Sequence, residues 1–213
     1  MRHQHLTQLI GTLAVATALI GLPTVAFAEV LTTAHNLSGL YGIDEICQPC
    51  HTPHNATTET AAPLWNHDVP LGSTFTPYSD LAGTLDATDV GDPSGVSLLC
   101  LSCHDGVTAI DSFGRTTGTN VMTSDAALGT DLSNDHPISF DYDAAQALDS
   151  GIIASSTTAS PLTGSIADEM LFGVGNTQME CASCHDVHDD AGIAGLLRIA
   201  NTDSDLCLTC HDK

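Results

Sequence analysis

The stretch MECASCHDVHDDAGIAGLLRIANTDSDLCLTCHDK (179–213) decides how this chain is organised. It holds half of the eight cysteines, in two segments of the form Cys-x-x-Cys-His: CASCH at 181–185 and CLTCH at 207–211. Two more such segments lie upstream, CQPCH at 47–51 and CLSCH at 100–104, so all eight cysteines belong to this pattern. Cys-x-x-Cys-His is the attachment signature of c-type haem.

The spacing within each segment suits one porphyrin. Two cysteines three positions apart can each add across one vinyl group, and the adjacent histidine presents a ring nitrogen to the iron as proximal ligand. The pattern therefore predicts four haem c groups per chain. The predicted thioether cysteines are Cys47, Cys50, Cys100, Cys103, Cys181, Cys184, Cys207 and Cys210, and the predicted proximal ligands are His51, His104, His185 and His211.

Paired cysteines also build zinc ribbons and disulfides, which are the two alternatives for these segments. The chain has 11 histidines among its 213 residues. A histidine directly after every one of four cysteine pairs is therefore far from what composition alone would give. This regularity favours haem attachment over zinc and over disulfides.

The N-terminal segment has the composition of an export signal. Residues 6–28 form an uncharged, mostly apolar run that ends in Ala-Phe-Ala, and a small-x-small ending predicts cleavage after it. The alternative is a retained membrane anchor, because the run is long enough to span a bilayer. We expect a signal peptide over residues 1–28, a single tetrahaem domain over residues 29–213, and no stable membrane insertion after cleavage.

The charge of the chain is strongly negative. The formal net charge of −22 becomes −23 after loss of the predicted signal, because Arg2 is the only charged residue within it. Arg115, Arg198 and Lys213 then face 26 carboxylates, which argues against nucleic acid or an anionic membrane as a partner. Cationic surfaces, metal ions and oxidised minerals fit this charge better; the alternative is that the acidity serves solubility alone.

The composition also predicts the fold class. Five Phe, three Tyr and one Trp supply few large side chains for a core, whereas each haem brings a large apolar ring system. We expect four covalently bound haems to form the core of a mostly irregular, loop-rich domain with short α-helices. The 18 Gly and nine Pro fit short helical turns at the attachment motifs, joined by irregular chain.

Five histidines outside the motifs and the predicted signal are available as distal ligands: His35, His54, His67, His136 and His188. Four irons need four of them, so bis-histidine ligation throughout is the economical interpretation. It leaves no open position on any iron, and we therefore expect no enzyme activity. His54 and His188 lie three residues after a proximal histidine, too close to reach the opposite face of the same porphyrin, so each is expected to serve a neighbouring haem.

Segments along nearly the whole predicted mature chain resemble the small tetrahaem cytochromes of the OmcE type. In order they read AHNLSG, EICQPCHTPHN, PLWNH, LLCLSCHDG, NDHPISFD, MECASCHDVH and DLCLTCH. The resemblance implies an extracellular cytochrome that polymerises into a filament, with haems stacked along it and one distal histidine supplied across the subunit boundary. It also implies the distal ligands His35, His54, His136 and His188, with His67 as an alternative to one of them.

The function that this resemblance implies is extracellular electron transfer through four closely stacked bis-histidine haems. The expected partners are further copies of the chain in a homopolymer, and other cytochromes, extracellular metal oxides or electrodes as redox partners. A soluble periplasmic electron shuttle is the first alternative. A multihaem reductase is the second, and it requires a high-spin haem in the assembled protein.

Overall fold

The computed structural model describes residues 29–57, 61–70, 74–78, 85–159 and 162–212. The predicted signal peptide, residues 1–28, lies outside the described residues, and so does Lys213. Within the described ranges, none of the helices is long and apolar enough to cross a lipid bilayer.

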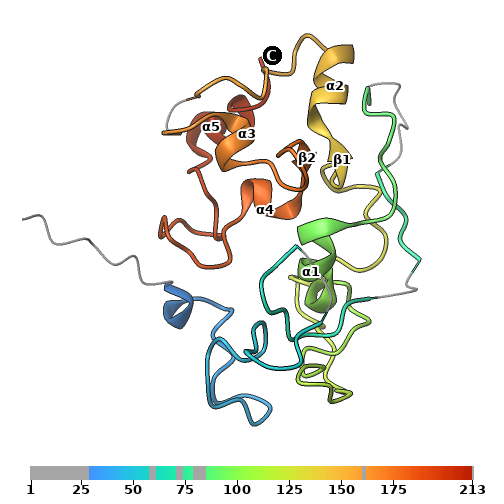
Figure 1. Cartoon of the computed structure of the whole chain (residues 1–213), viewed down its shortest axis with the longest axis vertical. Coiled ribbons are helices and arrows are strands. Elements are labelled where there is room, and N and C mark those ends of the chain that lie inside the picture. The colour runs from blue at the N-terminus through green and yellow to red at the C-terminus, as the bar shows by residue number, and fades with distance from the viewer. Residues whose placement is uncertain (1–28, 58–60, 71–73, 79–84, 160–161, 213) are drawn as a thin grey trace, which may run out of the picture.

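The described residues form short helices and two very short strands joined by long irregular segments (Figure 1). This confirms the loop-rich architecture predicted from the sequence. The helical elements are η1 (Glu29–Thr32), α1 (Gly95–His104), α2 (Tyr142–Leu148), α3 (Ile166–Glu169), α4 (Cys181–Cys184), η2 (Thr202–Ser204) and α5 (Asp205–Leu208), and the strands are β1 (Phe140–Asp141) and β2 (Gln178–Met179).

The attachment motifs form helical turns. The second motif ends α1, the third makes up α4, and the fourth begins within α5. In three motifs the histidine amide donates a hydrogen bond to the carbonyl of the first cysteine: His51 to Cys47 at 2.8 Å, His185 to Cys181 at 3.1 Å, and His211 to Cys207 at 3.0 Å. Because one helical turn spans about 3.6 residues, both cysteines of a motif face the same side as a single porphyrin requires.

The two strands join the middle of the molecule to its C-terminal part. β1 and β2 pair antiparallel, with Phe140 opposite Met179 and Asp141 opposite Gln178. Asp141 also caps α2, because its carboxylate accepts a hydrogen bond from the Ala144 amide at 2.8 Å. β2 leads directly into α4, and α4 packs against α1 (Figure 1). This packing brings the second and third motifs together.

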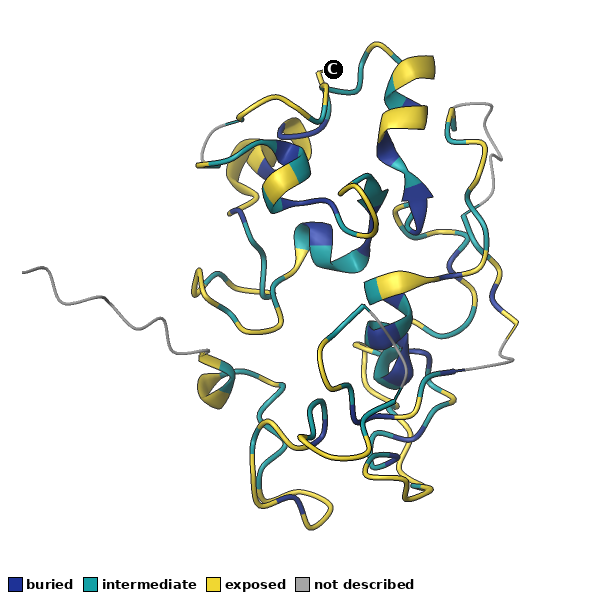
Figure 2. Cartoon of the chain, in the orientation of Figure 1, coloured by how far each residue is buried: buried dark blue, intermediate teal, exposed yellow. Residues whose placement is uncertain are grey.

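The apolar core is concentrated in the C-terminal part (Figure 2). There Tyr142 of α2, Ile166 and Met170 from the α3 segment, and Ile199 and Leu206 pack in one cluster with the strand residues. A second cluster contains three buried residues within the described ranges, and these are Phe75, Leu101 and Leu132. In the part of the chain that the structure describes, side chains therefore form a continuous core around α2, α3 and α5, but not around the first two motifs.

Candidate haem-binding site

Six of the predicted iron ligands come together as three pairs of imidazole rings. Each pair joins a motif histidine to a histidine that is distant in the sequence. The ring centroids are 6.0 Å apart for His35 and His104 at an interplanar angle of 66°, 6.4 Å for His51 and His188 at 13°, and 6.3 Å for His136 and His211 at 66°.

These separations match what one iron between two imidazoles requires. An imidazole–metal bond of about 2 Å, and about 1 Å from a ring nitrogen to its ring centre, place two such centroids roughly 6 Å apart. Imidazoles in direct van der Waals contact would lie closer. The residues present therefore fit haem c at these three positions.

Backbone carbonyls orient the motif histidines. The Nδ1 atom of His51 lies 2.9 Å from the Pro63 carbonyl oxygen, and that of His104 lies 2.8 Å from Ala126 O. A third bond of the same kind joins His185 Nδ1 to Gly195 O at 2.9 Å. A carbonyl oxygen only accepts hydrogen bonds, so each Nδ1 carries the proton and each Nε2 presents its lone pair. That tautomer is the one a metal ligand needs.

The His35 ring shows how the fold keeps a predicted distal ligand neutral. Burial lowers the pKa of His35, and neighbouring His104 lowers it further. Its Nδ1 atom is buried without a hydrogen-bond partner. A neutral ring keeps a lone pair available for a metal. His136, the ring that faces His211 of the fourth motif, has its Nδ1 atom 2.8 Å from the Pro137 carbonyl oxygen, which fixes the tautomer of that ring too.

His188 lies against His51 of the first motif, not against the iron position of its own motif. The role of His188 as a ligand of a neighbouring haem stays a prediction. Trp65 also lies near the His51 ring, in an edge-on arrangement with the two ring centroids 6.0 Å apart at an interplanar angle of 88°. Residues from two other segments of the chain, Trp65 and His188, therefore lie against the histidine of the first motif.

His67 has a different environment from the paired rings. Its side chain is only 1 % exposed. Its Nδ1 lies 2.7 Å from the Asp68 carbonyl oxygen, and its Nε2 lies 3.0 Å from that of Ile110. Both nitrogens therefore face hydrogen-bond acceptors. This environment suits a hydrogen-bonded core histidine better than an iron ligand.

His54 and His185 are left without a partner ring among the described residues. His54 is exposed on the loop after the first motif. It lines a pocket of about 270 Å³ together with Asn66 and Arg115. The Nδ1 atom of His185 is fixed by the Gly195 carbonyl, which leaves Nε2 free of the proton and able to bind a metal.

The cysteines show how neighbouring motifs adjoin. Burial and the adjacent Cys50 thiol raise the pKa of Cys103 to about 12. The thiols of Cys100 and Cys181 share a hydrogen bond, which raises the pKa of Cys100 and lowers that of Cys181. These pKa values describe the chain before haem attachment, because a thioether sulfur has no proton to lose.

The third and fourth motifs adjoin in the same way. Burial raises the pKa of Cys184 to about 11, with Cys210 and Cys207 contributing. All eight cysteines are free thiols in the structure. The motifs therefore lie next to one another in chain order, first beside second, second beside third and third beside fourth.

The comparison with protein families bears on this region. Residues 175–213 match the family described as the doubled CXXCH motif. The chain is a multihaem c-type cytochrome. A comparison with curated proteins found no match. The matched residues contain the third and fourth motifs of this cytochrome, and the first and second motifs repeat the same attachment pattern outside them.

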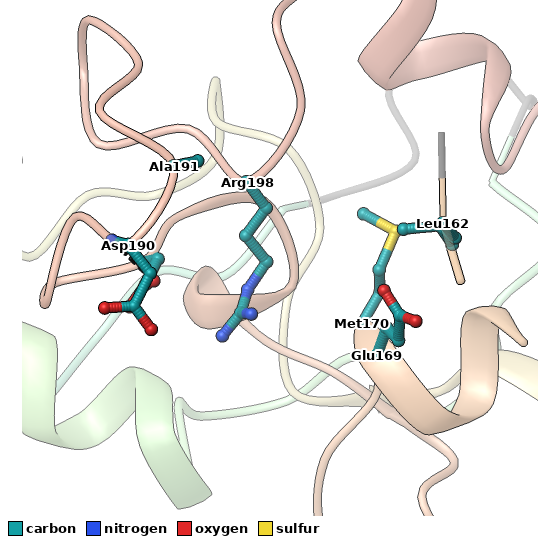
Figure 3. Close-up of a pocket in the computed structure, with 7 residues that line it drawn as sticks. Leu162, Glu169, Met170, Asp190, Ala191 and Arg198 are labelled. Carbon is teal, nitrogen blue, oxygen red and sulfur yellow. Dashed lines mark hydrogen bonds between the residues drawn. The ribbon is translucent and has the colours of Figure 1, made fainter. Parts of the chain in front are cut away.

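Sequence reasoning did not single out Arg198 as part of the haem environment. Its backbone amide donates to the Cys184 carbonyl at 2.9 Å, and its Nε donates to Ala182 O at 2.5 Å. The guanidinium lines a pocket of about 280 Å³, between Asp190 on one side and Glu169 on the other (Figure 3). A guanidinium beside the third motif is suited to a carboxylate such as a haem propionate. The scarcity of arginine in so acidic a chain was the available signal.

Proposed function

We propose that this cytochrome transfers electrons through four bis-histidine haems, as the repeating subunit of an extracellular filament. The observation that carries the electron-transfer part is the set of three imidazole pairs with centroids 6.0–6.4 Å apart. Haem c, when bound, supplies a one-electron iron couple. Two imidazoles on one iron leave no position for a substrate, so the proposal includes no catalysis at iron.

The protein's own contribution is orientation. The carbonyls of Pro63, Ala126 and Gly195 fix the proximal rings. In the proposed sites, the partner rings from remote segments would bind the irons on the opposite faces of the haems. Histidine on both faces favours a low reduction potential, because a methionine ligand is what raises it. The order of the motifs in space follows their order in the chain, which supports one continuous path through the subunit.

The filament part of the proposal is supported by the two unpaired histidines. His54 is exposed, and His185 is oriented by Gly195 but has no partner ring in the described part of its own chain. In the proposed filament, His54 of one subunit completes the iron site at His185 of the next subunit. Each subunit boundary would then contain one shared haem site, and the electron path would continue across it.

Electron microscopy of material sheared from cells, combined with the visible spectrum of the purified protein, tests both parts. We expect long fibres with four low-spin haems per chain. His54→Ala is expected to give discrete particles with one high-spin haem. His136→Ala is the matched control: it removes a ligand within one subunit, so it is expected to give one high-spin haem in fibres that still form.

Other outcomes would select the alternatives. Monomers of the wild-type protein with four low-spin haems would make it a soluble electron shuttle, with the periplasm as its location. A persistent high-spin haem in wild-type fibres or monomers would favour a reductase. Fibres of the His54→Ala variant with four low-spin haems would remove His54 from the subunit boundary.

A further inference from the structure

Glu180 is a buried carboxylate at the junction of two haem motifs, and electron transfer as proposed above gives it no role. It directly precedes Cys181 of α4, and its side chain contacts Ser97 of α1, one turn before Cys100. The residue is only 3 % exposed. It is therefore enclosed between the second and third motifs, which adjoin through the Cys100 and Cys181 sulfurs.

The site is built to hold a carboxylate oxygen. Glu180 Oε2 accepts hydrogen bonds from the Ser97 amide at 3.2 Å, from the Ser97 hydroxyl, and from the Ser139 hydroxyl at 3.1 Å. The other oxygen, Oε1, lies 2.6 Å from where a Cβ on Gly95 would be, and Gly95 has a φ of +53°. Any side chain at Gly95 would therefore meet both the carboxylate and a strained backbone.

The charge on this carboxylate is poorly compensated. The groups that face it are Ser97 and Cys100 from α1, Cys181 and Ser183 from α4, and Ser139 from the segment before β1. After thioether formation none of these carries a charge. Among the described residues no ion pair involves Glu180. Burial raises the pKa of Glu180, and the serine hydrogen bonds only partly oppose that shift.

We propose that Glu180 binds a proton when the haems of the second and third motifs are reduced, and releases it when they are oxidised. The proposal rests on the electron-transfer function proposed above. For each coupled event, one electron from an external reductant converts one Fe(III) to Fe(II). One proton from water adds to the Glu180 carboxylate and gives the neutral acid. On oxidation, the electron passes to an external acceptor and the proton returns to water.

The physical basis is electrostatic linkage. An electron added beside an anionic carboxylate in a poorly hydrated site increases the cost of that charge, so proton affinity rises on reduction. The effect is reciprocal, because a protonated Glu180 favours the reduced state to the same extent. The side chain stays in one position during protonation and deprotonation, because it is held by hydrogen bonds to Ser97 and Ser139 and by the backbone of Glu180.

Redox titration of the full haem-loaded protein at a series of pH values tests this proposal. A tenfold change in proton concentration corresponds to at most about 59 mV for one proton per electron. Part of the wild-type titration curve is expected to move to lower potential as the pH rises above the ordinary glutamate range. In Glu180→Gln that component is expected to lose its pH dependence, while the haems still reduce.

Haem propionates also titrate, so the diagnostic quantity is the difference between wild type and variant. Asp143→Asn is the control, because it removes one exposed carboxylate at the start of α2 and is expected to keep the wild-type pH dependence. Infrared difference spectra give a second measurement: reduction is expected to produce a protonated-carboxyl band in wild type and in Asp143→Asn but not in Glu180→Gln.

An unchanged pH dependence in Glu180→Gln, or no carboxyl band on reduction of the wild-type protein, would overturn the proposal. Absence of this band in the wild-type protein overturns the proposal even if the variant does not fold. Failure of the haems to accept electrons at any pH would instead contradict the proposed electron transfer. The two failures are thus distinguishable in the same titration.

Discussion

Among the described residues, the C-terminal part of the molecule has a side-chain core, and the N-terminal part shows no comparable one. Ten buried residues pack together around α2, α3 and α5, whereas the cluster beside α1 contains three (Figure 2). Both parts carry two attachment motifs. We therefore expect haem to add to an existing core in the C-terminal part and to supply most of the apolar core in the N-terminal part.

The largest expected effect comes from removing one haem from each part in turn. The double substitution Cys47→Ser and Cys50→Ser is expected to abolish the protection of backbone amides against hydrogen exchange in the described residues up to 78, because little side-chain packing remains there. Cys207→Ser with Cys210→Ser is expected to leave protection in α2 and α3. Hydrogen exchange with mass spectrometry measures both effects. Equal losses of protection in the two parts would contradict the expected difference in the role of haem.

A smaller effect is expected from a cavity in the C-terminal core. Ile166 is 0 % exposed, so Ile166→Ala is expected to reduce the free energy of unfolding by about 2–5 kcal/mol. Ile166→Val is the graded control, with a cost of about 0.5–1.5 kcal/mol. Denaturant titration of the haem-loaded protein, followed by near-UV circular dichroism, measures these changes. A decrease in the free energy of unfolding below about 1 kcal/mol for Ile166→Ala would mean that haem, and not side-chain packing, stabilises this region as well.

Removing one hydrogen bond in the same core tests its polar component. The Tyr142 hydroxyl donates to the Ile153 carbonyl at 2.7 Å, and the Tyr142 side chain is 2 % exposed. Tyr142→Phe keeps the ring and is expected to cost about 1–2 kcal/mol, because the carbonyl is left without this donor. The exposed Tyr41→Phe is the control and is expected to be neutral in the same denaturation measurement.

The smallest effect concerns a helix cap at the edge of the C-terminal core. The Ser165 hydroxyl and the Asp168 carboxylate form a capping box at the start of α3. Ser165→Ala is expected to cost about 1 kcal/mol, with Ser165→Asn retaining most of the stability. Thermal unfolding measures the difference. No change for Ser165→Ala would show that the α3 turn is held by Ile166 and Met170 alone.

Much of the site could be predicted from the sequence because haem attachment is local. Two cysteines and a histidine within five residues define each motif, so the eight cysteines and His51, His104, His185 and His211 could be named without a fold. The loop-rich architecture also follows from composition. The ligand roles of all these residues stay predictions until a haem-loaded protein is examined.

The pairing of distal rings could not be predicted from the residues. His35 reaches His104, and His188 reaches His51, across long irregular segments that carry no periodic signal. The C-terminal core was also underestimated, because Tyr142, Met170 and Leu206 are scattered over separate short elements. Glu180 gave no sign of burial, since a charged residue beside a motif ordinarily faces solvent.

The hydrogen bonds that orient the motif histidines have a consequence for maturation. The Nδ1 atoms of His51, His104 and His185 donate hydrogen bonds to carbonyls 12, 22 and 10 residues away in sequence. The second imidazole expected at each iron depends instead on the folded chain. The covalent chemistry needs only a short unfolded segment, so attachment can precede folding. A newly haem-loaded chain would then begin high-spin and become low-spin as remote rings arrive, so its colour would report how far assembly has advanced.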